Sequence, residues 1–173
     1  MDESTRDTPS QIGSLSELRE MLKEFDTAML VTVTPDGRLR SRPMALQDPA
    51  LVPDADLWFV SAEDSGKTEE IREDRQVNVS CLRSRDKAYI SISAIARIDN
   101  NPAEVGRLWK SDWKIWMSEE PSDGSISILK LTVEEAEYWQ PEGGRLRVLY
   151  SIVKSLLNDE PAEKSLNPPK RIV

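Results

Sequence analysis

The chain has 173 residues, a length that fits one domain, and 23 lysines and arginines against 31 aspartates and glutamates give it a formal net charge of −8. This acidic balance argues against a general nucleic-acid or anionic-membrane binder, and no apolar run approaches the ~20 residues that cross a bilayer. The sequence has no histidine and one cysteine, Cys81, which excludes histidine-dependent nucleophiles, histidine-ligated zinc or haem, and intrachain disulfides. We therefore expect no metal site, no secretory signal and a reducing, cytoplasmic setting.

The first half of the chain is predicted to form a loose arm, a helix, three strands and a second, short helix, at residues 1–13, 14–26, 28–33, 39–46, 57–61 and 68–74. Ser14 and Glu17 make a capping box at the start of the first helix, and a Pro-Asp-Gly turn at 35–37 joins the first two strands into a hairpin. Thr68 is expected to cap the second helix, and Ile71 is expected to point inward from it.

The second half is predicted to form two strands, a helix, a further strand and a final helix, at residues 77–82, 89–98, 101–117, 126–133 and 148–157. Pro102 suits the first turn of its helix. Residues 134–139 either extend the preceding strand past a bulge or form a strand paired with it. We expect one domain over residues 14–157, a polar tail over 158–173, and a small, mainly β antiparallel barrel with peripheral helices.

Two groups of residues carry candidate chemistry. Arg38, Arg40 and Arg42 alternate along one strand and so share a face, which is either a solvated surface or a site that captures an anion such as phosphate. The Ser-Gly-Lys-Thr segment at 65–68 follows a strand and opens a helix, so it is either a plain helix start or a loop that presents amides and a lysine to a phosphate. The segment is not a Walker A loop, because the first glycine of that motif is missing. If the strands between them pair, both groups meet at one phosphate.

A series of short motifs lies in a characteristic order: Asp-Gly-Arg at 36–38, Ser-Arg-Pro-Met at 41–44, Leu-Trp-Phe-Val-Ser at 57–61, Ser-Gly-Lys at 65–67, Ile-Arg-Glu-Asp-Arg-Gln-Val-Asn at 71–78, Tyr-Ile-Ser-Ile-Ser at 89–93 and Ala-Glu-Tyr-Trp at 136–139. In this order the chain resembles the pyridoxamine 5′-phosphate oxidase-like superfamily, and within it the general stress protein 26 group. The resemblance covers residues 15–140. It implies a split antiparallel β-barrel that forms a homodimer, with FMN or FAD at the interface.

The resemblance also implies which residues bind the cofactor: Arg42, Val60, Ser61, Ser65, Lys67, Tyr89, Trp116 and Trp139. Arg42, Ser65 and Lys67 would hold the phosphate, with Arg40 as a neighbour. The strand edge at 60–61 and the side chain of Tyr89 would lie along the flavin. The two tryptophans would approach the ring from the partner subunit.

Departures from the family pattern bear on the reaction. Gln47 stands where true pyridoxamine phosphate oxidases carry a lysine, and Trp139 is followed at 145–149 by Arg-Leu-Arg-Val-Leu instead of the Arg-Leu-His-Asp-Arg substrate motif. Ala94 also replaces a common glycine. We therefore expect a flavin-dependent oxidoreductase or a flavin-binding stress protein, of unknown substrate, instead of a true pyridoxamine phosphate oxidase. A deazaflavin-dependent reductase and a non-catalytic, flavin-sensing dimer are the alternatives.

The remaining candidates are expected to be structural. Trp109 and Trp113 are expected to pack in the core or a dimer contact, with a flavin lid as the alternative for Trp116. Trp58 is expected to be half-buried, and Cys81 is expected to be an inert core thiol. The acidic residues at 63–64, 69–74 and 134–137 are expected to be solvated.

Overall fold

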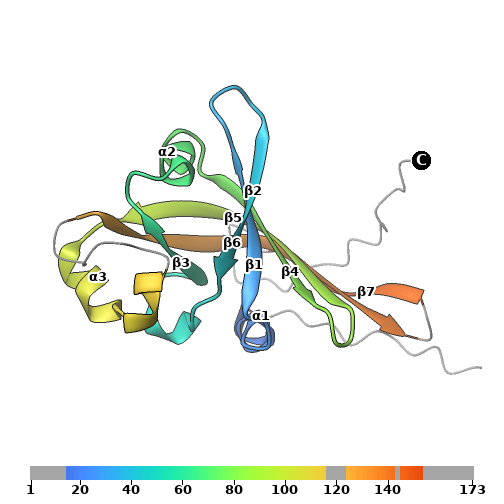
Figure 1. Cartoon of the computed structure of the whole chain (residues 1–173). Helices are drawn as coiled ribbons and strands as arrows, with labels where there is room; N and C mark the ends of the chain where they lie inside the picture. Colours follow the sequence, from blue (N-terminus) through green and yellow to red (C-terminus); the bar gives the residue numbers. More distant parts are fainter. Residues whose placement is uncertain (1–14, 116–123, 143–144, 154–173) are drawn as a thin grey trace, which may run out of the picture.

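The computed structural model describes residues 15–115, 124–142 and 145–153 (Figure 1). In chain order the elements are α1 (Leu15–Leu22), β1 (Thr27–Val33), β2 (Leu39–Ala45), the 3₁₀ turn η1 (Pro49–Leu51), β3 (Leu57–Ala62), α2 (Gly66–Glu73), β4 (Gln76–Arg83), β5 (Ala88–Asp99), α3 (Pro102–Leu108), the 3₁₀ turn η2 (Ser111–Ile115), β6 (Ile126–Glu142) and β7 (Arg145–Val153). The prediction of a mainly β fold with peripheral helices is confirmed.

The strands form one antiparallel sheet in the order β2-β1-β4-β5-β6-β3, with β7 paired to β6. The sheet curls so far that β2 and β3, the two ends of this order, come close to each other. The long strand β6 continues past a register shift opposite Ser93 and Ala94, so residues 134–139 extend the strand after a bulge, one of the two predicted possibilities. The result is a split antiparallel β-barrel (Figure 1).

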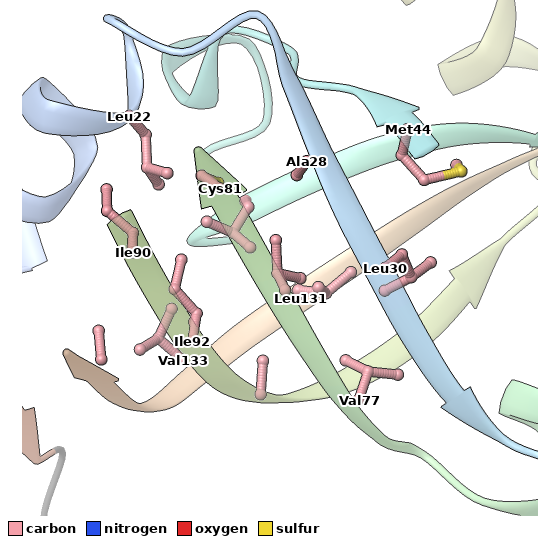
Figure 2. Close-up of a cluster of buried hydrophobic side chains, with 14 of the residues drawn as sticks. Leu22, Ala28, Leu30, Met44, Val77, Cys81, Ile90, Ile92, Leu131 and Val133 are labelled. Carbon is pink, nitrogen blue, oxygen red and sulfur yellow. The ribbon is translucent and has the colours of Figure 1, made fainter. Parts of the chain in front are cut away.

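Apolar side chains from most of the strands and from α1 fill the barrel. Figure 2 shows part of this core: Leu22, Ala28, Leu30, Met44, Val77, Cys81, Ile90, Ile92, Leu131 and Val133. Cys81 is buried, and burial raises the pKa of its thiol to about 12, in agreement with the expected inert role.

A second core lies on the other side of β3, where α3 and η2 cover the sheet (Figure 1). Its buried members include Trp58, Trp113, Ile126 and Ile128. The prediction that Trp58 is half-buried is wrong: its side chain is 0% exposed, because β3 is covered on both faces. Trp113 and Trp109 pack edge-to-face with centroids 5.6 Å apart, so the expected core role is confirmed for Trp113.

Several predicted helix boundaries are corrected. The final helix at 148–157 is wrong where the structure describes it, because β7 runs from Arg145 to Val153 and pairs with β6. The β-branched and aromatic residues of this segment, and the free edge that β6 offers, outweigh its helical apolar spacing. The predicted helix at 101–117 ends at Leu108 and continues only as η2. Residues 1–14 and 154–173, and with them the predicted arm, Ser14 cap and tail, lie outside the described residues.

Lys130 of β6 anchors the loop before β3. Its side chain is buried, and its Nζ lies 2.8 Å from Asp99 Oδ2 and 3.1 Å from Asp54 Oδ2. The hydrogen bond from Lys130 lowers the pKa of Asp99, and hydrogen bonds from Arg97 and then Lys130 lower the pKa of Asp54. Burial alone would lower the pKa of Lys130, but its bonds to both carboxylates leave that pKa raised.

Replacing Lys130 with methionine is expected to lower the free energy of unfolding by about 2 kcal/mol at pH 7, because Asp99 loses its buried partner. Aspartates with a lowered folded pKa contribute stability above their ordinary pKa of 3.8 and lose it as the pH falls through the folded value. The gap between wild type and K130M, measured by urea unfolding, should therefore shrink below pH 4 (about the ordinary carboxyl pKa). The exposed Lys110→Met change is the control, and a gap that stays constant down to pH 2 (about the lower end of this loss) would refute the ion-pair account.

Candidate functional site

A cleft of about 420 Å³ lies where β2 and β3 approach each other. The described residues that line it are Thr27, Pro43, Met44, Ala45, Gln47, Val60, Ser61, Ala62, Lys67 and Trp113. Most of this lining is apolar, and Lys67 is the one charged side chain among these ten. Such a cleft suits a planar, largely apolar ligand that carries an anionic group.

The start of α2 provides the polar part of the cleft. Ser65 is the N-cap residue, and the helix begins at Gly66, so the amides of Gly66 and Lys67 have no carbonyl four residues back within the helix. These amides and the helix dipole favour an anion at this point. Lys67 lies in the same first turn and adds a full positive charge.

Three hydroxyl groups give the loop before α2 its shape. Thr68 Oγ1 and Ser61 Oγ each donate a hydrogen bond of 3.0 Å to the carbonyl oxygen of Ala62. Ser65 Oγ lies 3.0 Å from Ser61 Oγ and 2.9 Å from Thr68 Oγ1, and because each hydroxyl has one proton it can donate to only one of these two groups. The predicted Thr68 cap is therefore wrong, since Thr68 lies inside α2, whereas Ile71 is buried as expected.

The two arginines of β2, Arg40 and Arg42, pair with one carboxylate, and Arg38, just before the strand, pairs with another. Arg42 donates to the Thr32 hydroxyl and, at 2.8 Å, to Oε2 of Glu70 on α2, while Arg40 donates to Oε1 of the same carboxylate at 3.3 Å. Arg38 instead pairs with Asp36 at the hairpin turn. Two of the three arginines thus converge on α2, beside the loop that carries Lys67.

Lys67 and Arg42 are close enough to affect each other electrically. Burial lowers the pKa of Lys67 most, and the positive charge of Arg42 lowers it further. Two cations held together in this way would both be stabilised by an anion bound between them. The arginine strand and the Ser-Gly-Lys loop therefore lie together in the structure.

Glu70 is a site residue that sequence reasoning missed. The acidic residues at 69–74 were expected to be solvated, but Glu70 is only 3% exposed. Burial raises the pKa of its carboxyl, yet the hydrogen bonds from Thr32 and Arg42 leave that pKa below its ordinary value. Because its burial depends on long-range contacts with Arg42 and Thr32, no local sequence signal could have found it.

The other predicted site residues do not all meet at the cleft. Val60 and Ser61 line it, but Tyr89 and Trp139 face each other across β5 and β6 and line a separate hollow of about 400 Å³, together with Ser80, Cys81, Ile90 and Ser91. Trp116 lies outside the described residues. Within one chain, therefore, the predicted residues divide between two places.

The cleft also contains residues that the sequence did not single out as ligands. Met44 and Trp113 form apolar walls, and Trp113 is held edge-to-face by Trp58 with ring centroids 6.1 Å apart. Gln47 accepts a hydrogen bond of 3.1 Å from Lys110 Nζ. Lys110, which lies between α3 and η2, thus reaches Gln47 in the cleft lining.

Comparisons with known proteins identify relatives of this chain by family and by fold. The family model described as pyridoxamine 5′-phosphate oxidase like matches residues 13–163. The fold is similar to general stress protein 26 from Bacillus anthracis, at 21% identity and a TM-score of 0.59, with 72% of this chain and 92% of that chain covered. It is similar to a general stress protein 26-related protein from Clostridium acetobutylicum, at 16% identity and a TM-score of 0.62, with 77% and 91% covered.

A third structure is described as a pyridoxamine 5′-phosphate oxidase-related, FMN-binding protein from Nostoc punctiforme. It shares 12% identity with this chain at a TM-score of 0.58, and the match covers 72% of this chain and 83% of that one. No curated protein matches the sequence. Among the described residues, none of the helices has the length and apolar character needed to cross a membrane.

Proposed function

Because the chain belongs to the pyridoxamine 5′-phosphate oxidase-like family, we propose that it binds FMN in the cleft between β2 and β3. The observation that carries this proposal is geometric: Arg42 pairs with Glu70 on α2, one turn after Lys67, which lines the apolar cleft. An FMN-binding relative with the same fold supports it.

In this proposal different residues contact different parts of the ligand. Lys67, Arg42 and the first amides of α2 would hold the phosphate by charge-assisted hydrogen bonds. The apolar side chains of Met44 and Val60 would flank the ring system, with Trp113 as a further wall. Ser65, whose hydroxyl points toward Ser61 and Thr68, would act mainly by shaping the loop.

We propose an oxidoreductase role that differs from pyridoxamine phosphate oxidation. The bound flavin would supply the redox chemistry, and the protein would supply binding, orientation and exclusion of water. Gln47 in place of a lysine, and the missing Arg-Leu-His-Asp-Arg motif, remove groups that grip the phosphate of that substrate. A cytoplasmic stress role is part of the same proposal, and the free, buried thiol of Cys81 suits a reducing compartment.

In a homodimer, Tyr89 and Trp139, the predicted residues that lie away from the cleft, could contact the ligand of the partner subunit. Tyr89 and the 53%-exposed Leu82 lie opposite each other on the outer face of the sheet, and Met29 is a further exposed apolar side chain on that face. Tyr89 also borders the hollow that Trp139 lines. A second copy packed here would cover this apolar surface and could place Tyr89 and Trp139 beside the flavin of its partner.

The test is a titration of the purified protein with FMN, followed by flavin fluorescence and absorbance, with the mass in solution measured with and without the ligand. We expect micromolar or tighter binding and a dimer mass, and reduction of the bound flavin by a nicotinamide donor would support the oxidoreductase role. A protein that leaves FMN fluorescence unchanged at micromolar concentration would refute the proposal. Binding without reduction by any nicotinamide donor would favour a sensing dimer.

Replacing Lys67 with methionine is expected to weaken FMN binding about tenfold, because one charge-assisted contact to the phosphate is lost. Riboflavin, which has no phosphate, should bind the wild type and K67M equally. The control is Lys23→Met, which removes an exposed lysine that pairs with Glu20 on α1 and does not line the cleft. Equal FMN affinities for K67M and wild type would place the phosphate elsewhere.

A further inference from the structure

Glu70 is a buried carboxylate in the middle of a cluster of cations. It lies one helical turn after Lys67 on α2 and accepts hydrogen bonds from Arg42, Arg40 and Thr32. A carboxylate so close to an anion site would weaken the binding of an anion by repulsion if charge were its only contribution. Because Glu70 is buried and accepts hydrogen bonds from three side chains, it can instead hold those side chains in position.

The bonds around Glu70 form a closed ring. One nitrogen of Arg42 donates to the Thr32 hydroxyl, that hydroxyl donates to Glu70 Oε2, and the other terminal nitrogen of Arg42 donates to the same oxygen. Every proton in the ring has one acceptor, and Thr32 is fully buried. The guanidinium of Arg42 is therefore held in one orientation, and its remaining N–H groups stay available to a ligand.

The charges of the cluster also match a particular ligand class. Arg40, Arg42 and Lys67 carry three positive charges, against the negative charges of Glu70 and of Asp64 near Lys67, so the site is net positive. A phosphate monoester carries close to two negative charges at neutral pH. The net positive charge of the cluster thus suits a phosphate group.

We propose that Glu70 is a positioning residue that holds Arg42, through the ring with Thr32, in the orientation that receives the phosphate monoester of the ligand. This inference rests on the proposed binding of FMN in the adjoining cleft. The effect of charge and the effect of position have opposite signs, so they can be separated by experiment. Loss of a repelling charge would strengthen phosphate binding, whereas loss of the clamp would weaken it.

The test compares Glu70→Gln with Glu73→Gln. Both changes remove one negative charge from α2, but the Glu73 side chain is exposed and lies one turn further along. We expect E70Q to weaken FMN binding about tenfold, because Arg42 loses a charge-assisted partner, and E73Q to leave it unchanged within about twofold. Glu70→Asp keeps the charge but withdraws the carboxylate by one methylene, so it should weaken FMN binding as well and carries the test if E70Q does not fold.

Riboflavin separates positioning from a general effect on the fold. Affinity for riboflavin should be the same in the wild type, E70Q, E70D and E73Q, because it lacks the phosphate. FMN binding by E70Q and E70D at wild-type strength or tighter would overturn the role of Glu70, and so would an equal loss of FMN and riboflavin affinity. A wild type that binds no FMN would refute the proposed function itself, and with it this inference.

Discussion

Replacing Arg42 with methionine is expected to weaken FMN binding by about 100-fold and to lower the free energy of unfolding by about 3 kcal/mol. Both effects come from the same position. Arg42 is proposed to contact the phosphate, and its removal also takes the shorter of two arginine bonds from Glu70, a carboxylate that is 3% exposed. Among the described residues, the longer bond from Arg40 and the bond from Thr32 remain. Unfolding in urea and titration with FMN measure the two effects separately.

Two further variants separate binding from stability. The double variant R42M/E70L removes both members of the ion pair, so it should recover most of the lost stability while FMN binding stays weak. Arg38 immediately precedes β2, is 79% exposed and pairs with Asp36 at the turn, so Arg38→Met should change the free energy of unfolding by less than about 0.5 kcal/mol. Wild-type stability in R42M would show that Glu70 does not depend on Arg42.

Only the part of the candidate site that belongs to a recognisable motif could be predicted from the sequence. The alternating arginines and the Ser-Gly-Lys segment indicated an anion site before any contact was known, and the structure brings Arg42 and Lys67 together. Glu70 could not be found in this way, because an acidic residue in a polar helix is normally solvated. Its burial depends on the pairing of β2 with β1, which places Arg42 and Thr32 against α2.

The fold shows the same division between local and tertiary information. Alternation and β-branching predicted the strands from 28 to 98 within a few residues, since these signals are local. Residues 148–153 have apolar spacing that fits a helix, but they pair with β6 as β7. The two faces of β3 could not be distinguished either, because the alternation of Trp58 and Phe59 does not reveal that α3 and η2 cover the outer face.

Trp58 carries the second large prediction. Replacing it with alanine is expected to lower the free energy of unfolding by about 4 kcal/mol, because a fully buried indole is replaced by a cavity. The loss also removes the hydrogen bond of 2.8 Å from Trp58 Nε1 to the carbonyl oxygen of Asp48, and the edge-to-face support of Trp113 in the cleft. Urea unfolding measures the first effect, and a weaker FMN affinity would report the second.

Two further variants separate the contributions to the stability lost in W58A. Trp58→Phe keeps an aromatic ring in the second core, but it removes the indole hydrogen bond to the Asp48 carbonyl and leaves a small cavity, so it should lower the free energy of unfolding by about 2 kcal/mol. The Asp48 carbonyl still accepts a hydrogen bond of 3.2 Å from the Leu51 amide. Trp109→Ala removes a half-buried tryptophan that also packs edge-to-face with Trp113, and it should lower the free energy of unfolding by about 1 kcal/mol. If W58A were no less stable than W109A, the outer face of β3 would be open to solvent in solution. The cleft would then lack the rigid wall that Trp113 is proposed to give it.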